Sequence, residues 1–142
     1  MTPKTTKTVK PKAGRYFEAV GRRKTSIARV RIHAGKPGTN VEVNDKKFAV
    51  YFPLEKHRRT VVSPFEGLSL KEYEVTAKVS GGGVSSQAEA VRLGVSRALI
   101  LMNPIWRSRL KVLGFMKRDP RMVERKKPGL RKARRPQQWR KR

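Results

Sequence analysis

The sequence predicts an α+β domain over residues 15–113, with a short basic arm before it (residues 1–14) and an extended basic tail after it (residues 114–142). Three observations lead to this prediction. Residues 26–33 and 74–79 alternate apolar and polar side chains, the two-residue period of half-buried strands. Apolar residues between Ser86 and Met102 recur at helical spacing instead. Residues 114–142 lose all periodicity and are dominated by Lys and Arg.

The first part of the domain is predicted to be extended. Residues 16–20 form one extended piece, and residues 26–33 form a strand with alternate side chains on two faces. Residues 41–43 resume the alternation, and residues 74–79 give a further strand. Residues 48–54 are apolar but short, so no type is assigned to them. The expected core face of the second strand consists of Ala28, Val30 and Ile32, and the expected breaks are Gly35, Pro37, Gly38 and Gly81–Gly83.

A helix is predicted after the three glycines. Ser86 is expected to be its N-cap, because Glu89 follows three residues later in the capping-box pattern. A second helix is expected to begin at Asn103-Pro104 and to end at Gly114. The predicted apolar stripe of the first helix consists of Ala88, Val91, Val95, Ala98, Leu99 and Met102, and Arg92, Ser96 and Arg97 lie off it.

The charge indicates a polyanionic partner. The chain has 36 Lys and Arg against 10 Asp and Glu, a formal charge of +26, and a free globule with this imbalance repels itself. Nucleic acid is the leading candidate, because phosphate contacts release condensed counterions. An anionic membrane would also attract the charge, but no apolar run is long enough to span a bilayer, and no signal peptide is seen.

No cofactor or metal is expected. The chain has no Cys, which excludes disulfides and thiolate metal sites and fits a reducing compartment. His33 and His57 are too few and too far apart in sequence to indicate a metal cluster.

Two short motifs suggest phosphate binding. Residues 21–25 are interpreted as a turn in which an exposed Gly21 and three cations, Arg22, Arg23 and Lys24, hold a phosphate; the alternative is a solubilising hairpin loop. Gly81-Gly82-Gly83 lies between a strand and a helix start, where backbone N–H groups favour an anion. A purely structural turn explains the same glycines. A kinase-like enzyme is a third interpretation, but the P-loop lysine pattern is absent, and the nearby acids, Glu74 and Glu89, each have a structural explanation.

The tail is the most informative segment about partner class. Its prolines prevent regular structure, and its arginines suit bidentate phosphate contacts. Fully extended, it could reach at most roughly 95 Å. Trp139 lies among polar and basic residues, where it could stack on an unpaired base. A nuclear-localisation signal is the alternative for such a basic run.

These motifs together resemble the ribosomal protein S nine family of the small subunit. The matching pieces run in order from about residue 16 to the last residue. They are Gly21–Thr25, Ala28–Val30, Tyr51-Phe52, Gly81–Gly83, Gln87-Ala88, Arg97–Leu99, Leu110-Lys111, Arg118–Arg121, Glu124–Lys127, Gly129–Arg134 and Lys141-Arg142.

The resemblance implies a ribosomal S5 domain 2-like fold: a mixed sheet packed by helices, with an unusual left-handed βαβ crossover. It also implies a place in the head of the small subunit, against rRNA of the 3′ major domain and beside other ribosomal proteins. There the tip of the tail touches the anticodon stem-loop of P-site tRNA. Three departures are Ser86 where the family usually has Gly, Trp139-Arg140 at the tip, and residues 1–14, which lie outside the resemblance.

The hypothesis is therefore a non-enzymatic structural constituent of the small ribosomal subunit. It is expected in the ribosomes of the cytoplasm, with an organellar ribosome left open. A histone-like nucleic-acid-compacting protein is the main alternative. The expected tRNA-binding residues are Arg140, Lys141 and Arg142. The expected rRNA-binding residues are Arg22, Arg23, Lys24, Arg29, Arg31, Gly81, Gly82, Gly83, Arg118, Arg121, Arg125, Lys126, Lys127, Arg131, Lys132, Arg134, Arg135 and Trp139.

Overall fold

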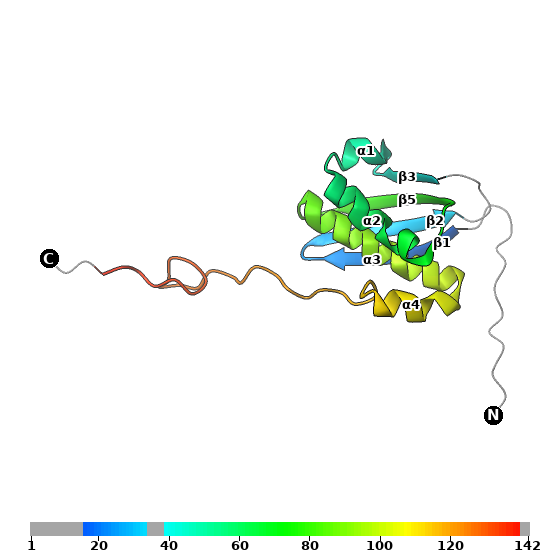
Figure 1. Ribbon diagram of the computed structural model, residues 1–142. Helices are drawn as coiled ribbons and strands as arrows, with labels where there is room; N and C mark the ends of the chain where they lie inside the picture. The colour runs from blue at the N-terminus through cyan, green and yellow to red at the C-terminus, as the bar shows by residue number, and fades with distance from the viewer. Residues whose placement is uncertain (1–15, 34–38, 140–142) are drawn as a thin grey trace, which may run out of the picture.

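A five-stranded sheet and its helices form the domain in the computed structural model, which describes residues 16–33 and 39–139 (Figure 1). The predicted N-terminal arm, the break at Gly35, Pro37 and Gly38, and the tail tip lie outside the described residues. In chain order the elements are β1 (Tyr16–Arg23), β2 (Ser26–His33), β3 (Thr39–Val43), β4 (Lys46–Lys47), α1 (Phe48–Tyr51), α2 (Glu55–Leu68), β5 (Tyr73–Ser80), α3 (Val84–Met102), the 3₁₀ turn η1 (Pro104–Trp106) and α4 (Arg107–Val112).

The sheet is mixed, which confirms the predicted α+β class. Its strand order is β1-β2-β5-β3-β4, and every neighbouring pair is antiparallel except β3 and β5. The parallel pair β3–β5 is connected through α1 and α2, which is the βαβ unit that the resemblance implies. The left hand of this crossover stays a prediction.

The strand β2 follows the predicted alternation. Ala28, Val30 and Ile32 are buried, whereas Arg29 is exposed and Arg31 is half-buried on the opposite face. The strand β1 runs further than the sequence suggested and ends only at Arg23. The turn to β2 is therefore just two residues long, with Lys24 in the left-handed region at φ 51°.

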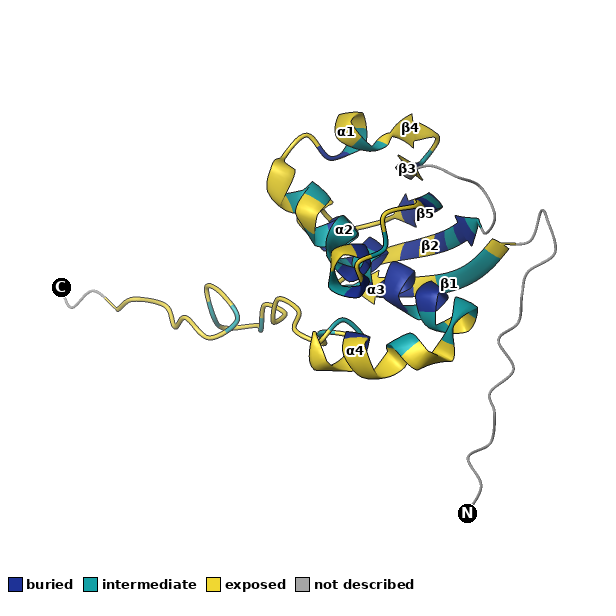
Figure 2. Ribbon diagram, turned by 45° about the vertical axis from the view of Figure 1, so that its right-hand side comes forward, coloured by how far each residue is buried: buried dark blue, intermediate teal, exposed yellow. Residues whose placement is uncertain are grey.

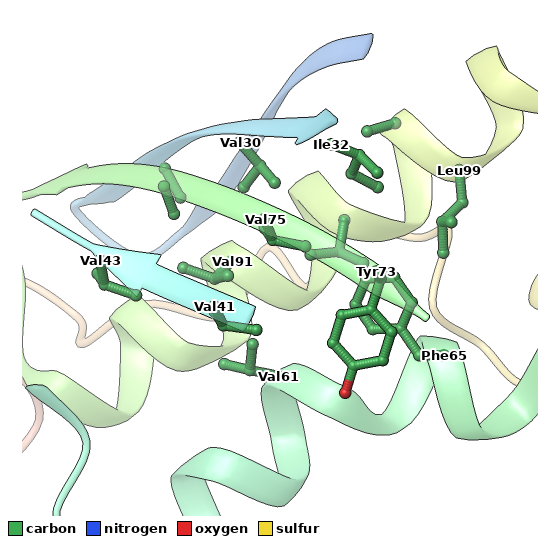
Figure 3. Close-up of a cluster of buried hydrophobic side chains, with 14 of the residues drawn as sticks. Val30, Ile32, Val41, Val43, Val61, Phe65, Tyr73, Val75, Val91 and Leu99 are labelled. Atoms are coloured by element: carbon green, nitrogen blue, oxygen red, sulfur yellow. The ribbon is translucent and has the colours of Figure 1, made fainter. Parts of the chain in front are cut away.

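The helices α2 and α3 cover one face of the sheet and enclose the core between them (Figures 1 and 2). Valines of the sheet point toward aromatic and aliphatic side chains of the two helices (Figure 3). The rings of Phe65 on α2 and Tyr73 on β5 stack with centroids 3.8 Å apart. No described element covers the other face of the sheet, so its outward residues are available to solvent or to a partner.

The helix α2 was not predicted, and its interior proline explains part of this. Pro64 has no N–H to donate to the carbonyl of Thr60, a loss that ordinarily breaks a helix. The Ser63 hydroxyl donates to the Thr60 carbonyl instead, at 2.8 Å, so this carbonyl keeps a partner. Val61, Phe65 and Leu68 lie one helical turn apart and are buried, and their contact with the sheet and α3 stabilises the helix.

The helix α3 begins three residues earlier than predicted. Its N-cap is Gly83 rather than Ser86, and Ser86 occupies the third helical position. From there the Ser86 hydroxyl accepts the Gly83 N–H at 3.1 Å, one half of a capping box. The predicted apolar stripe is buried apart from a half-buried Met102, but Ser96, expected off the stripe, is buried as well. Its hydroxyl donates to the Arg92 carbonyl, which satisfies the group without solvent.

The second predicted helix is present as η1 followed by α4. The Asn103 side chain accepts the Ile105 N–H at 3.1 Å, as expected of a cap, and Pro104 is the first residue of η1. Gly114 follows α4 at φ 75°, the left-handed conformation expected at a helix end. Residues 48–54, left unassigned, form the four-residue helix α1 and the segment after it.

The described part of the tail projects away from the domain (Figure 1). Its described residues, 114–139, contain no helix or strand. Phe115 and Met116 still pack against the core, however, so the chain leaves the domain slightly later than the predicted boundary. Among the described residues, no helix has the length and apolar character needed to cross a membrane.

Candidate RNA-binding surface

Gly21 is a packing residue rather than the exposed glycine that the sequence suggested. It is buried where β1 crosses α3, and a Cβ added to it would lie 1.9 Å from the Ala90 carbonyl oxygen and 2.5 Å from the Gly94 nitrogen. No L side chain fits such a distance. The prediction that Gly21 belongs to a phosphate-gripping turn is therefore wrong, and close contact between strand and helix is its role.

The three cations near the turn have different surroundings. Arg22 and Lys24 are exposed and have no side-chain partner among the described residues, so both are free to meet an anion. Arg23 is bound within the protein, with its side chain only 12% exposed. It forms ion pairs with Glu89 on α3 and, at 3.1 Å, with Asp119 of the tail.

Arg23 thereby joins the domain to the root of the tail. Its guanidinium also donates to the Arg121 carbonyl oxygen at 2.7 Å. Arg121 in turn donates to Asp119 through its side chain and its backbone N–H, and these hydrogen bonds, with Arg23 nearby, hold the pKa of the Asp119 carboxyl well below its usual range. Arg23 and Arg121 were both predicted to bind rRNA, but in the structure the Arg23 side chain contacts the tail.

The glycines 81–83 form a turn whose polar groups are largely used internally. Gly81 and Gly82 have φ of 73° and 63°, which favours glycine. The Gly81 carbonyl accepts from the hydroxyl of Ser26 and from the side-chain amide of Gln87. A Cβ on Gly82 would meet the Ser26 hydroxyl at 2.1 Å. These contacts support the structural interpretation, while the exposure of all three glycines leaves phosphate binding a prediction.

Arg29 and Arg31 lie on the open face of the sheet beside an acid. The Arg31 Nε lies 2.6 Å from a Glu18 carboxylate oxygen, and the Arg29 Nε lies 4.0 Å from the other. The hydrogen bond to Glu18 raises the pKa of Arg31, whose guanidinium also lies 4.7 Å from the Tyr16 ring centroid. By strand register, this face carries both signs of charge: Arg22, Arg29, Arg31 and Lys78 against Glu18, Glu42 and Glu74. The positive electrostatic potential of this face is therefore partly cancelled by its carboxylates.

The charged residues in and around α4 are all cations, and the sequence analysis did not identify this surface. Between Ala90 and Asp119 the chain has no acid, and its cations are Arg92, Arg97, Arg107, Arg109, Lys111, Lys117 and Arg118. Arg107, Arg109 and Lys111 on α4 are exposed and have no ion-pair partner in the part of the chain that the structure describes. Most of the α4 ribbon is accordingly coloured as exposed in Figure 2. The absence of acids between Ala90 and Asp119 could have indicated this surface from the sequence, but these residues were analysed only for their helical pattern.

The tail contains a closed loop that composition did not suggest. Glu124 binds Lys127 at 2.9 Å and Arg134 at 2.8 Å, and these contacts lower the pKa of its carboxyl. The Arg131 N–H donates to the Arg135 carbonyl oxygen at 2.8 Å. Gly129, at φ 78°, reverses the chain direction inside the loop. Part of the tail therefore has a defined local shape, although it was expected to take shape only around a polyanion.

Most of the predicted tail residues remain available. Trp139 is 88% exposed, consistent with an aromatic that has no place in a protein core. The predicted tip residues Arg140, Lys141 and Arg142 lie outside the described part. The tail cations without an ion-pair partner among the described residues are Lys117, Arg118, Arg125, Lys126, Arg131, Lys132 and Arg135.

Within the described residues no cluster of His, Asp or Glu could hold a metal ion.

Fold and surface together define a class of protein, namely a basic α+β domain with many unpaired cations, including those on α4 and along a projecting tail, as suits a polyanionic partner. Comparison with known proteins specifies the class further. The family model described as "Ribosomal protein S9/S16" matches residues 21–142.

Individual relatives agree with the family match. The small ribosomal subunit proteins uS9 of Cytophaga hutchinsonii and Amoebophilus asiaticus are 48% and 47% identical over 127 residues, which cover 89% of this chain and 98% of each relative. The uS9m protein of Arabidopsis thaliana is 46% identical over 130 residues, which cover 91% of this chain and 30% of that protein.

The chain belongs to the ribosomal protein S9/S16 family. This is a non-enzymatic family of ribosomal proteins, so the kinase-like and histone-like alternatives are set aside. The resemblance predicted from the sequence motifs is confirmed.

Proposed function

We propose that this chain is a structural constituent of the small ribosomal subunit that binds rRNA of the head through the α4 surface and the tail. The observation that carries the proposal is the set of exposed, unpaired cations on α4 and along residues 118–135. Phosphate contacts of this kind position a protein on folded RNA and read its shape rather than its sequence. Neighbouring ribosomal proteins are the further partners expected in that setting.

The basic residues of the domain and the tail are proposed to have different roles in RNA binding. Arg22, Lys24 and the unpaired tail cations contact phosphates directly, whereas Arg23 fixes the direction in which the tail leaves the domain. Arg29 and Arg31 contribute less, because Glu18 compensates their charge. The closed loop around Glu124 orders the tail before it meets RNA, which lowers the entropy cost of binding.

The salt dependence of binding tests the RNA surface. Full-length protein should bind rRNA from purified small subunits with an affinity that falls steeply as salt rises. Replacing Arg109 and Lys111 with Ala should reduce the slope by about one per lost phosphate contact. Arg59→Ala is the matched control, because Arg59 is an exposed helical arginine already paired with Glu55. A slope that is shallow, or equal in all three proteins, would reject the α4 surface.

The resemblance supports a second role for the tip. We propose that Arg140, Lys141 and Arg142 contact the anticodon stem-loop of tRNA in the P site. Deleting these three residues should weaken retention of P-site tRNA in reconstituted subunits while leaving subunit assembly intact. Unchanged tRNA affinity after the deletion would reject this role, and failed assembly would show that the tip is needed to build the subunit instead.

A further inference from the structure

A hollow of about 350 Å³ lies where α4 passes into the tail. It is lined by Arg107, Lys111, Gly114, Met116 and Lys117. We propose that this hollow binds the base of one unpaired rRNA nucleotide, while the surrounding cations hold its flanking phosphates. The proposal rests on the RNA-binding function above and adds a specific site to it, formed by residues that were not among the expected rRNA-binding residues.

The floor of the hollow suits a flat, weakly polar group. Met116 is half-buried and packs against the domain core, so its thioether offers a supported, polarisable contact for an aromatic ring. The methylene stems of the lining cations add apolar surface below their charged ends. Gly114 leaves the space open, because no atom lies within 4 Å of the place where its Cβ would be.

The rim of the hollow selects for negative charge. None of the five lining residues is acidic, and Arg107, Lys111 and Lys117 form no ion pair within the described residues. The next acid along the chain is Asp119, which is already paired with Arg121 and Arg23. A ligand that combines an aromatic ring with phosphates matches this floor and rim together, and a nucleotide has both.

Size and surroundings favour a nucleotide within RNA over a free one. At about 350 Å³ the hollow is near the lower end of the range of about 300–1,000 Å³ usual for small-molecule pockets, so it can accept one base while the flanking phosphates stay outside. Lys117 and Arg118 follow Met116 directly along the chain and are exposed, so cationic side chains continue from the hollow into the tail, which is proposed to bind further phosphates. Proteins commonly recognise RNA through such splayed-out bases.

The first test compares two ligands of equal charge in the full-length chain. Fluorescence anisotropy would measure binding of a single-stranded ribo-oligonucleotide and of an abasic backbone of the same length. All measurements use a Trp139→Ala background, so that the tail tryptophan does not contribute stacking. We expect about fivefold tighter binding of the base-bearing strand, the low end of what one stacked base contributes. Met116→Ser should abolish this preference, with circular dichroism checking the fold.

The control is Arg109→Ala, which removes a cation from the same helix outside the hollow. It should weaken binding of both strands equally and leave the preference intact. Equal binding of the two strands by the parent protein would overturn the proposal, because only phosphates would then be contacted. Failure of the parent protein to bind either strand would instead overturn the RNA-binding function itself. Competition by a free mononucleotide at low concentration would overturn the choice of RNA as the source of the base.

A second measurement is independent of any variant. Ultraviolet crosslinking of purified small subunits, followed by trypsin and mass spectrometry, should place a crosslinked nucleotide on the peptide of residues 112–117, which holds Gly114 and Met116. Crosslinks to tail peptides with none on this peptide would overturn the site while leaving the proposed function standing.

Discussion

Gly21→Ala is the substitution that most directly tests the packing described here. It adds a single methyl group to β1 at the crossing with α3. The backbone of Gly21 is not in the left-handed region, so the substitution carries no penalty from its own φ. Its effect therefore measures the contact between strand and helix.

The expected magnitude follows from what the new methyl group would meet. Its neighbours are backbone atoms of α3, the Ala90 carbonyl oxygen at 1.9 Å and the Gly94 nitrogen at 2.5 Å. Backbone atoms cannot rotate away as a side chain can, so strand and helix must separate. Overpacking costs about 1–3 kcal/mol in most cores, and this site lies at the upper end, about 3 kcal/mol. For a domain of this size the loss corresponds to a fall in Tm of roughly 12–24 °C.

Urea denaturation of the full-length chain, followed by far-UV circular dichroism, measures the change. The denaturation midpoint should fall with an unchanged m-value, as expected when stability changes and the surface exposed on unfolding does not. Gly67→Ala is the matched control, because its new methyl group would clash only with the flexible tip of Leu113, at 2.5 Å, and would lie at an ordinary contact distance of 3.8 Å from Phe115. Together with the better helix propensity of Ala, this control should stay within about 1 kcal/mol of the parent.

Two results would refute the reasoning. A Gly21→Ala protein within about 0.5 kcal/mol of the parent, the range of ordinary surface substitutions, would show that the close contact is not there. A protein of normal stability with reduced rRNA affinity would restore the interpretation of Gly21 as part of a phosphate-binding turn.

Three further predictions follow. Arg23→Ala should release the first residues of the tail from the domain, and amide hydrogen exchange over residues 115–122 should become faster. The free energy of unfolding should fall by only about 1 kcal/mol, because Glu89 and Asp119 remain accessible to water. Unchanged exchange would contradict the anchoring role of Arg23. Removing residues 114–142 should lower the slope of log affinity against log salt by more than any single substitution, and an equal slope would contradict binding through the tail. The pKa of Glu124 is lowered, so the loop should persist above the ordinary carboxylate range and loosen as pH falls through the lowered value. Glu124→Gln should remove this pH dependence in backbone chemical shifts, and persistence of the dependence would assign it elsewhere.

Several elements could be predicted because they depend on local patterns. The alternation of β2 and the apolar stripe of α3 each specify one buried face, and the structure places both against the same core. The caps at Asn103 and Gly114 have local chemistry that does not depend on the rest of the fold. By contrast, no helix was predicted over the residues of α2. Its interior Pro64 argues against a helix, and the Ser63 hydroxyl and the packing of the buried face compensate for this.

The candidate surface was predicted only in part, because residue type does not show where a side chain's charge is used. Arg23 and Lys24 are adjacent in the same basic run, yet Arg23 is bound by Glu89 and Asp119, which lie far along the chain, while Lys24 is exposed. Arg107 and Lys111 looked like ordinary helix positions until the fold brought them beside Met116.

The sequence by itself determined the α+β class, the excess of positive charge and the extended tail, since each is a property of composition or of short-range period. Only the tertiary structure decided which charges remain free, because neutralisation depends on contacts between residues distant in the chain. It also decided that Gly21 is buried, since the cost of a side chain there arises from a helix that follows more than sixty residues later. The physical reason is the same in both cases: local patterns determine elements, whereas the packing of those elements determines the surroundings of each side chain.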